Sequence, residues 1–420
     1  MNQLALLGGK PVTGKLIEKS ELISRSDLER QYLLQAYDSG TWDDWPGEDS
    51  MAEKFGLEWA EFCGSAHCAL LTNGTHTLQV ALETLDIGAG DEVIVPGLTW
   101  QATASAVCDV NAVPVIVDVE PDTLCIDVSK AEAAITPNTR AIIPVHLYHR
   151  IADMEALLAL AEKHHLHIIE DCAHVHGAQW KGHAAGTMGV MGSFSFQRSK
   201  LMTAGEGGAL LMQDEDLYWK VVSQRSCGRE YDGRKVHSGN YRMTSLQAGV
   251  LRGQLEALKH NAAIIDRNGL ALDAAVEAAP GVQSLRRSEK ISRQCSYAFV
   301  FLYDAAVFDG VTNPLFREAL SAELGMTFHT TYTPLSHSEV YYPHTKKRHQ
   351  LNAEYIEAIN PSRWDLPVAD DIWKNRAVLA QWDIFGCPGN RAQLITDAIA
   401  KIHDNRGELI TYMKSRGERQ

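Results

Sequence analysis

Residues 141–171 read AIIPVHLYHRIADMEALLALAEKHHLHIIED, and this stretch decides the fold. Apolar residues dominate 141–146, helical spacing of apolar residues runs over Met154–His164, and a second apolar run occupies 166–171. We therefore predict a strand, a helix and a second strand. Two apolar strands joined through a helix are typical of a mostly parallel sheet that is covered on both faces.

The same alternation extends to both sides of this stretch. A helical pattern at 75–85 precedes apolar runs at 92–96 and 113–118, and further apolar runs follow at 192–196 and 208–212. We predict an α/β fold for this part of the chain. A helical stretch at 255–279 then precedes a strand at 296–301, and residues 390–415 read as polar helix. We place the change of domain in the helical stretch, which divides the chain into residues 1–265 and 266–420.

Composition excludes several classes of function. The 420 residues are 45% hydrophobic and 22% charged, as in an ordinary globular enzyme. A net charge of −14 argues against general affinity for nucleic acid or an anionic membrane. Residues 1–10 lack the basic start and long apolar run of a signal peptide, and no apolar run has the length of a membrane span. We therefore expect a cytoplasmic protein.

Cysteine and histidine patterns give no metal signature. The eight cysteines form no Cys-x-x-Cys pair, which indicates reduced thiols. Cys63 and Cys68 bracket a histidine, but no second pair stands at matching spacing. We assign the histidines of 164–167 to the C-terminal end of a helix, where positive charge is favourable. We therefore predict no metal site.

A single lysine stands out in residues 193–208, which read SFSFQRSKLMTAGEGG. We interpret this segment as an apolar strand that ends on Lys200, with a glycine-rich turn behind it. A lysine held against a rigid strand can act as an amine nucleophile toward a carbonyl, and pyridoxal phosphate is its commonest biological partner. An ordinary solvated lysine after a strand is the alternative at this point.

Other polar and aromatic residues follow predicted strands, where ligands gather in open parallel sheets. Asp171 could pair with a pyridinium nitrogen or could cap a helix. Residues 72–75, Thr-Asn-Gly-Thr, open a helix and form either a phosphate cradle or a simple turn and cap. Trp100 could stack on a flat ring or pack against the protein. His146 and His174 also lie at strand ends.

Taken in order, these residues resemble the pyridoxal-phosphate sugar aminotransferases of the DegT/StrS type, within the fold-type-I superfamily. The resemblance covers about residues 60–255 through specific ordered motifs and continues more weakly to the C-terminus. Its motifs are Thr72–Thr75, Gly88–Pro96, Leu98–Trp100, Val117–Val119, Pro144–His146, Glu170–His174, Lys200, Gly205–Gly208, Ser238–Met243 and Gln247-Ala248.

The resemblance implies a large domain with a seven-stranded-type, mostly parallel sheet and a smaller α+β C-terminal domain. It implies catalytic roles for Lys200, which forms the Schiff base with pyridoxal phosphate and moves the proton, and for Asp171, which pairs with the ring nitrogen. Trp100 would stack on the ring and His174 would lie beside it. The phosphate would be held by Gly74, Thr75 and Ser195, and by Asn240 of a neighbouring subunit.

The family therefore implies a homodimer or larger homo-oligomer with shared active sites. L-glutamate or L-glutamine would donate the amine, pyridoxamine phosphate would carry it, and a keto-sugar or keto-cyclitol would accept it. Residues 45–51 and 118–123 resemble those of 2-deoxy-scyllo-inosose aminotransferases of aminoglycoside antibiotic pathways, and residues 173–178 and 197–203 resemble those of 3-amino-5-hydroxybenzoate synthase. We favour the amino-sugar or aminocyclitol function.

The chain departs from the family after Tyr148, where His149 and Arg150 replace the usual glycine. We interpret this change as added bulk and positive charge near the mouth of the site, which would suit an acidic substrate. Tyr148, His149 and Arg242 are thus candidate substrate residues. An aromatising enzyme on the same scaffold remains the alternative function. A regulatory protein that binds the cofactor is disfavoured, because no basic face accompanies the net charge of −14.

Overall fold

The computed structural model describes residues 3–45, 47, 49–230, 233 and 235–416. Its centre is a seven-stranded sheet in the order β1-β9-β8-β5-β4-β2-β3. The strands are β1 (His67–Leu71), β2 (Glu92–Pro96), β3 (Val113–Val117), β4 (Thr139–Ile142), β5 (His167–Asp171), β8 (Met191–Ser195) and β9 (Gly208–Met212).

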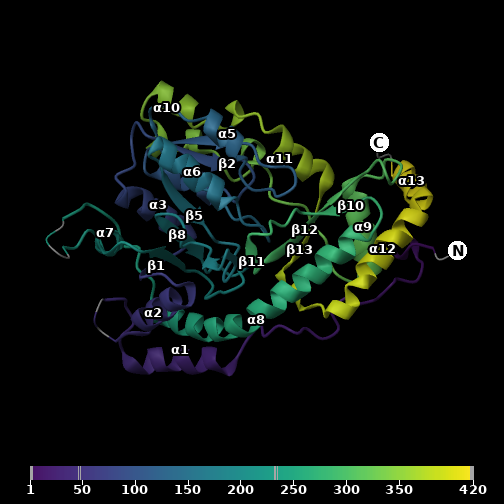
Figure 1. Cartoon of the computed structure of the whole chain (residues 1–420), viewed down its shortest axis with the longest axis horizontal. Helices are drawn as coiled ribbons and strands as arrows, with labels where there is room; N and C mark the ends of the chain where they lie inside the picture. Colours follow the sequence, from purple (N-terminus) through teal and green to yellow (C-terminus); the bar gives the residue numbers. More distant parts are fainter. Residues whose placement is uncertain (1–2, 46, 48, 231–232, 234, 417–420) are drawn as a thin grey trace.

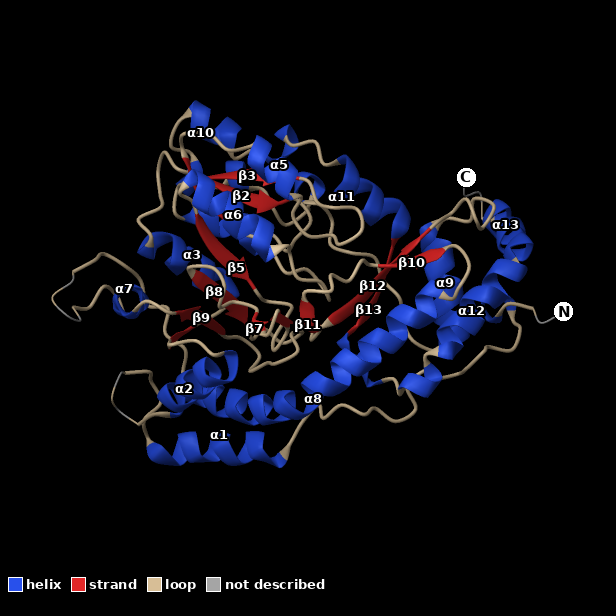
Figure 2. Ribbon diagram, viewed as in Figure 1, coloured by secondary structure: helices blue, strands red, loops and turns tan. Residues whose placement is uncertain are grey.

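Most of this sheet is parallel. Strands β3, β2, β4, β5 and β8 run in one direction, whereas β9 pairs antiparallel with both β8 and β1. Helices flank the strands, as Figure 2 shows. They are α1 (Asp27–Ser39), α2 (Met51–Cys63), α3 (Gly74–Thr84), α4 (Ala102–Asp109), α5 (Val128–Ala133), α6 (Met154–His164) and α7 (Glu215–Arg225). The predicted α/β class is confirmed.

Helix α8 (Ser245–Glu277) connects the two halves of the molecule. It packs on α1 and α2 at one end and on α12 at the other (Figure 1). Thr244 and Gln247 form a reciprocal capping box at its start, so the helix begins ten residues before the predicted 255. The domain boundary predicted near residue 265 falls inside this helix, and the division into 1–265 and 266–420 stays a prediction.

The C-terminal half holds a small three-stranded sheet in the order β10-β12-β13. A second small sheet, β11-β6-β7, joins the two halves. These elements and the remaining helices are β6 (Gln179–Trp180), β7 (His183–Ala184), β10 (Val282–Ser284), β11 (Ile291–Arg293), β12 (Ala298–Tyr303), β13 (Ala377–Gln381), α9 (Asn313–Leu324), α10 (Ala353–Ala358), α11 (Pro367–Asp371), α12 (Gln393–Asp404) and α13 (Arg406–Ser415).

Short helical turns complete the chain: η1 (Ala5–Leu7), η2 (Leu335–His337), η3 (Pro343–Thr345), η4 (Lys347–His349), η5 (Pro361–Arg363), η6 (Ile372–Arg376, a π-helix), η7 (Trp382–Gly386) and η8 (Gly389–Arg391). Residues 335–371 return to the large sheet. The backbone amides of Val368 and Ala369 donate to the Asp118 carboxylate over 2.8 and 3.0 Å, and Tyr355 packs on Cys108.

Two predicted strands end earlier than expected. The run 141–146 forms a strand only to Ile142, because Pro144 has no N–H for the ladder; Val145 then makes one isolated bridge to Asp171. Strand β8 ends at Ser195, so Lys200 lies in the turn after the strand and not at its end. Of the motif at 45–51, Pro46 and Glu48 lie outside the described residues.

Other expectations agree with the structure. Helix α6 ends at His164 and His165 closes it in a left-handed conformation, whereas His167, also assigned to this helix end, begins β5. All eight cysteines are free thiols. Within the described ranges, no helix combines the length and apolar character that a membrane crossing requires.

Candidate active site

A cavity of about 790 Å³ opens at the carboxyl ends of β5 and β8. In open α/β sheets this edge is where ligands bind. The cavity brings together seven residues that the sequence singled out: Gly74, Thr75, Trp100, Asp171, His174, Ser195 and Lys200. They come from four separate parts of the large sheet and its helices: the start of α3, the segment after β2, the end of β5 and the end of β8.

The start of α3 forms one end of the cavity. Asn73 caps this helix, since its side chain accepts from the His76 amide over 2.9 Å. The amides of Gly74 and Thr75 precede the first intrahelical bonds, and no described residue accepts from them. A Cβ on Gly74 would lie 2.7 Å from the Ser195 Cβ. Glycine therefore lets the helix start and Ser195 approach closely enough to form a concave anion cradle.

Asp171 ends β5 with its carboxylate buried. Oδ2 accepts from the Thr103 hydroxyl over 2.9 Å, and Oδ1 accepts from the Ala173 amide over 3.2 Å. Burial raises the pKa of this carboxyl above its ordinary value, although both hydrogen bonds and the Lys200 charge oppose the shift. Neutral donors leave the carboxylate suited to a cationic partner from a ligand.

Lys200 is held in the turn after β8, where its amide donates to the Gln197 carbonyl. Burial lowers the pKa of its amine to about 8, against the smaller opposing effect of Asp171. Its Nζ lies 4.7 Å from the ring centroid of Tyr297. A lysine with a lowered pKa holds a larger neutral fraction near pH 7, and the neutral amine is the nucleophile.

Aromatic side chains form the opposite wall. Trp100 is 48% exposed, and its ring centroid lies 5.7 Å from that of Tyr332. Tyr297 and Tyr332 line the cavity, and their hydroxyl oxygens are 2.5 Å apart. The sequence analysis did not identify the two tyrosines, which lie outside the strand ends of the large sheet. It also did not identify Thr103, which carries no charge.

His174 connects this wall to the protein interior. Its Nδ1 accepts from the Tyr148 amide over 3.2 Å, and its Nε2 lies 3.2 Å from the Tyr332 hydroxyl. Burial, reinforced by the positive charge of Lys200, lowers the pKa of this imidazole well below its ordinary value. The ring is therefore neutral.

Tyr148 lies behind the cavity and not in its lining, which corrects its prediction as a substrate residue. It is fully buried, and its φ is 53°, a left-handed conformation. Its hydroxyl accepts from the Tyr332 amide over 2.9 Å, and its carbonyl accepts from the Ser296 hydroxyl. Its backbone and side chain thus support His174 and Tyr332.

The interpretation of His149 as a positive charge near the mouth of the site is wrong. His149 is buried against Phe299, with ring centroids 4.8 Å apart, and its Nδ1 accepts from the Val300 amide over 3.4 Å. Burial lowers its pKa to about 4, so the imidazole is uncharged at neutral pH. It therefore cannot attract an acidic substrate group.

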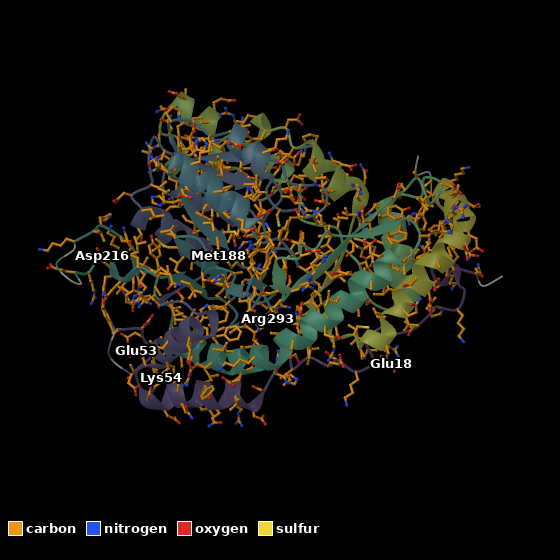
Figure 3. The ribbon with its side chains drawn as sticks, viewed as in Figure 1. Glu18, Glu53, Lys54, Met188, Asp216 and Arg293 are labelled. Atoms are coloured by element: carbon orange, nitrogen blue, oxygen red, sulfur yellow. The ribbon has the colours of Figure 1, made fainter. Side chains whose placement is uncertain are left out.

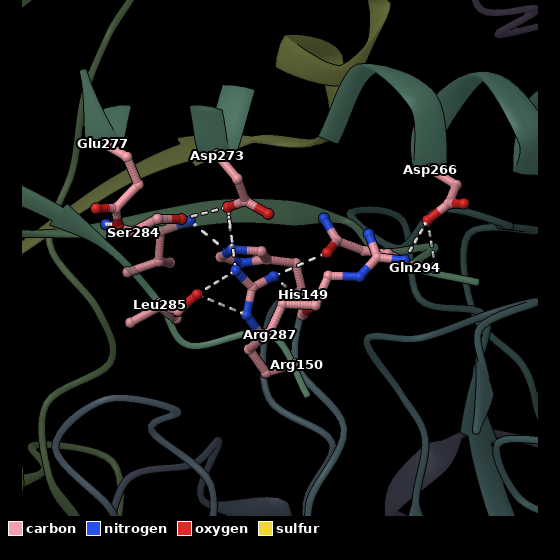
Figure 4. A network of polar contacts seen from close by, with 10 residues as sticks. His149, Arg150, Asp266, Asp273, Glu277, Ser284, Leu285, Arg287 and Gln294 are labelled. Atoms are coloured by element: carbon pink, nitrogen blue, oxygen red, sulfur yellow. Dashed lines mark hydrogen bonds and ion pairs between the residues drawn. The ribbon is translucent and has the colours of Figure 1, made fainter. Parts of the chain in front are cut away.

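His149 and Arg150 belong to a buried polar network that Figure 4 shows. Arg150 donates to the Asp273 carboxylate over 3.0 Å and to Gln294 over 2.8 Å. Asp273 comes from α8, and its Oδ1 lies 3.8 Å from the His149 Nε2. The network joins the loop after β4 to α8 and to the segment around β10 and β11.

Arg242 and Asn240 lie outside the cavity lining. The Arg242 guanidinium is 5.0 Å from the Trp45 ring centroid, and Arg229 is 4.5 Å from the same ring. Asn240 is exposed, and its side chain accepts from the Arg242 amide over 3.3 Å. Within a single chain, the structure does not bring either predicted residue to Lys200.

Three buried residues beside Asp171 have potential metal-ligating atoms within 4.8 Å of one another: His146, Glu170 and Cys172. Glu170 accepts from His146 over 3.0 Å and from the amides of Gly186, Met188 and Gly189 over 2.7 to 2.9 Å. Met188 lies toward the middle of the molecule (Figure 3). The cluster thus acts as an anchor for the loop before β8.

Comparison with known proteins gives consistent matches. The model of the DegT/DnrJ/EryC1/StrS aminotransferase family matches residues 24–378. The chain is 37% identical to a putative L-glutamine:3-amino-2,3-dideoxy-scyllo-inosose aminotransferase of Streptomyces kanamyceticus, over 97% of this chain and 98% of the relative. It is 40% identical to the L-glutamine:2-deoxy-scyllo-inosose aminotransferase of Streptomyces lividus, over 81% and 84%.

Among solved structures, the crystal structure of 3-amino-5-hydroxybenzoic acid synthase superposes with a TM-score of 0.78 at 31% identity. The match covers 91% of this chain and 100% of that chain. The family model, the two relatives and this solved structure thus each match most of the chain.

Proposed function

Because the chain belongs to the DegT/DnrJ/EryC1/StrS aminotransferase family, we propose that it moves the amine of L-glutamine or L-glutamate to a keto-cyclitol, with a keto-sugar as the wider class. Two relatives that match most of the chain are named for L-glutamine and for inosose ketones. Aminocyclitols of this kind belong to antibiotic biosynthesis, which is the pathway class that we propose.

The family implies pyridoxal phosphate, and the cavity fits this group at three points. The Gly74 and Thr75 amides, which have no acceptor among the described residues, form with Ser195 a cradle for phosphate that a side chain at residue 74 would fill. Asp171 offers a buried carboxylate with neutral hydrogen-bond partners only. Lys200 provides an amine whose pKa is lowered to about 8. The Lys200 amine is the observation that carries the proposal.

In this proposal, each residue has a distinct role. Bound pyridoxal phosphate supplies an electron-poor ring that stabilises negative charge on a substrate carbon. Lys200 would hold it covalently at rest and would then move a proton at the substrate carbon. Asp171 would keep the ring nitrogen protonated, and Trp100 would cover the ring. His174, Tyr297 and Tyr332 would form an aromatic wall of the cavity.

Two half-reactions follow from these roles. In the first half-reaction the donor would leave as a 2-oxo acid, and its amine would stay with the bound cofactor. In the second half-reaction the ketone would take up that amine, and Lys200 would deliver a proton to the former carbonyl carbon. Both half-reactions use the same amine at Lys200, so loss of that amine stops both.

We also propose a homodimer with shared active sites. Asn240 is exposed and does not line the cavity of its own chain, as expected of a residue that serves the site of a second copy. Mixing Lys200→Ala with Asn240→Ala protein tests this arrangement. With shared sites, random mixed dimers regain roughly a quarter of the intact sites. Without sharing, the mixture stays as inactive as its components.

The function is tested by incubating the protein with pyridoxal phosphate, L-glutamine and 2-deoxy-scyllo-inosose. We expect an aminated cyclitol and one equivalent of a 2-oxo acid. The Lys200→Ala variant should retain the cofactor without a covalent link and form no product. Transamination by that variant at the wild-type rate would overturn the assignment.

A second function is favoured by the match to 3-amino-5-hydroxybenzoic acid synthase. An aromatising enzyme on this scaffold would eliminate water from a cyclic ketone and would not consume an amino donor stoichiometrically. Measuring the 2-oxo acid released per product therefore separates the two functions.

A further inference from the structure

Two tyrosines on the cavity wall form a hydrogen-bonded pair, and one of them lies beside the Lys200 amine. Tyr297 directly precedes β12, and Tyr332 lies in the loop between α9 and η2. Their hydroxyl oxygens are 2.5 Å apart, and the Tyr297 ring centroid lies 4.7 Å from the Lys200 Nζ. Both side chains line the cavity.

The hydrogen on the His174 ring can be assigned from its neighbours. The Tyr148 backbone amide can only donate, so Nδ1 of His174 carries no hydrogen. The ring is neutral, because burial lowers its pKa well below the ordinary value. Nε2 therefore carries the single ring hydrogen and donates it to the Tyr332 hydroxyl oxygen over 3.2 Å.

One of the two hydroxyl hydrogens of the tyrosine pair is then left without an acceptor in the described part of the protein. The two tyrosines hold two hydroxyl hydrogens, since burial raises the pKa of Tyr332 to about 12 and raises the pKa of Tyr297 well above its ordinary value. The bond between the two hydroxyls uses one hydrogen, and the bond from His174 uses none. Among the described residues, no other acceptor lies within hydrogen-bond distance of either hydroxyl. The second hydrogen is left for a ligand in the cavity.

We infer that the Tyr297–Tyr332 pair donates this hydrogen to a ring hydroxyl of the acceptor ketone and thereby selects hydroxylated rings. The inference rests on the proposed function and names a determinant of its acceptor specificity. Because the Tyr297 ring lies beside the Lys200 amine, the pair is next to the place where the reacting carbon must bind.

The charge around the pair favours a neutral hydroxyl over a carboxylate. Lys200 is the one lysine or arginine among the described residues that line the cavity. Besides the Lys200 amine, the rings of Trp100 and His174 lie against the pair. A carboxylate bound to the pair would accept one hydrogen bond from a neutral phenol and would find no cation other than Lys200 to balance its charge. A neutral ring hydroxyl needs no such cation, and one phenol donor is enough for it.

The test requires the double variant, because either tyrosine alone still carries a hydroxyl hydrogen. Tyr297→Phe/Tyr332→Phe removes the donor, and Tyr341→Phe is the matched control. Tyr341 is also buried, but its hydroxyl contacts Cys108 Sγ at 3.7 Å, away from the cavity lining. Each holoenzyme is assayed separately for the L-glutamine half-reaction and for the ketone half-reaction.

We expect the double variant to lose about tenfold or more in kcat/KM for 2-deoxy-scyllo-inosose, since a site built around a hydroxyl depends on that hydrogen bond. The L-glutamine half-reaction should lose less than the ketone half-reaction, and the variant should still show the absorption of bound cofactor. Selectivity for 2-deoxy-scyllo-inosose over cyclohexanone, which has no ring hydroxyl, should fall by the same factor. Each single variant should lose less.

Unchanged selectivity in the double variant would overturn the inference while the proposed function stands. An equal loss in both half-reactions would overturn it as well, because it would indicate a general structural role. A wild-type enzyme that accepts amine from L-glutamine but never transfers it to an inosose would instead overturn the proposed acceptor, and the inference with it.

Discussion

The backbone amide of Tyr148 donates to Nδ1 of His174 over 3.2 Å, and this bond fixes which ring nitrogen faces the cavity wall. Tyr148 adopts a left-handed conformation with φ of 53°. The Arg150 guanidinium, two residues on, is bonded to Asp273 of α8. The long connecting helix thus supports the loop that orients His174.

His174 should therefore be replaceable by a residue with the same pattern of acceptor and donor. In His174→Gln, the amide oxygen can accept from Tyr148 and the amide nitrogen can donate to Tyr332, so we expect kcat/KM for the ketone within about threefold of wild type. His174→Leu leaves a buried amide unpaired and should lose about tenfold or more. Equal losses in the two variants, measured as ketone half-reactions, would contradict this role.

Gly74→Ala should weaken cofactor binding. The new Cβ would lie 2.7 Å from the Ser195 Cβ, so the helix start or the serine must move out of the cradle. We expect the Kd for pyridoxal phosphate to rise about tenfold or more, measured by titration of the apoprotein. Gly56→Ala in α2 is the control, because its nearest contact would be 3.6 Å away. Unchanged affinity for pyridoxal phosphate in Gly74→Ala would contradict the proposal that this cradle binds the phosphate.

Covalent attachment of the cofactor should report the pKa of Lys200. Burial lowers this pKa from 10.5 to about 8, so the fraction of neutral amine in the apoprotein rises through pH 8. The rate at which the visible absorption of bound pyridoxal phosphate develops should therefore increase with a midpoint near pH 8. A midpoint near 10.5 would mean that the amine is solvated in the apoprotein.

His149 should make the fold sensitive to acid. Burial lowers its pKa from 6.5 to about 4, so the unfolded chain binds a proton in this range that the folded protein does not. Its contribution to the free energy of unfolding is present above pH 6.5 and decreases as the pH falls toward 4. From pH 6.5 to 5 the loss amounts to about 2 kcal/mol.

The measurement is urea unfolding of wild type and His149→Gln across this range. The variant should show the weaker pH dependence, whatever its stability at pH 7. His183→Gln, at an exposed position of β7, should keep the wild-type dependence. If His149→Gln also keeps it, other buried groups such as His176, whose pKa burial lowers to about 3, account for the acid sensitivity.

The sequence was sufficient for elements whose pattern is local. The apolar run at 92–96 and the helical spacing over 154–164 coincide with β2 and α6, because burial on both faces and side-chain periodicity determine them directly. Lys200 and Asp171 were found because strand ends of a parallel sheet converge at one edge. The structure places both in the lining of the cavity.

The missed features depend on contacts between distant segments. The Tyr332 amide donates to the Tyr148 hydroxyl, which is 184 residues away in the sequence, and nothing in the sequence around residue 332 predicts that contact. His149 was misinterpreted for the same reason. Its burial against Phe299 and beside Asp273, from two later elements, determines its charge. Local sequence cannot distinguish such a histidine from one at the mouth of a site.

The most direct test of the proposed function is the visible absorption of the holoprotein during the two half-reactions. We predict that L-glutamine or L-glutamate removes the absorption band of Lys200-bound cofactor with release of one equivalent of 2-oxo acid, and that 2-deoxy-scyllo-inosose then restores it. The Lys200→Ala variant should show neither change, whereas Lys259→Ala, at an exposed position of α8, should show both. A wild-type band that neither amino donor alters would contradict the assignment of the protein as a transaminase using these donors.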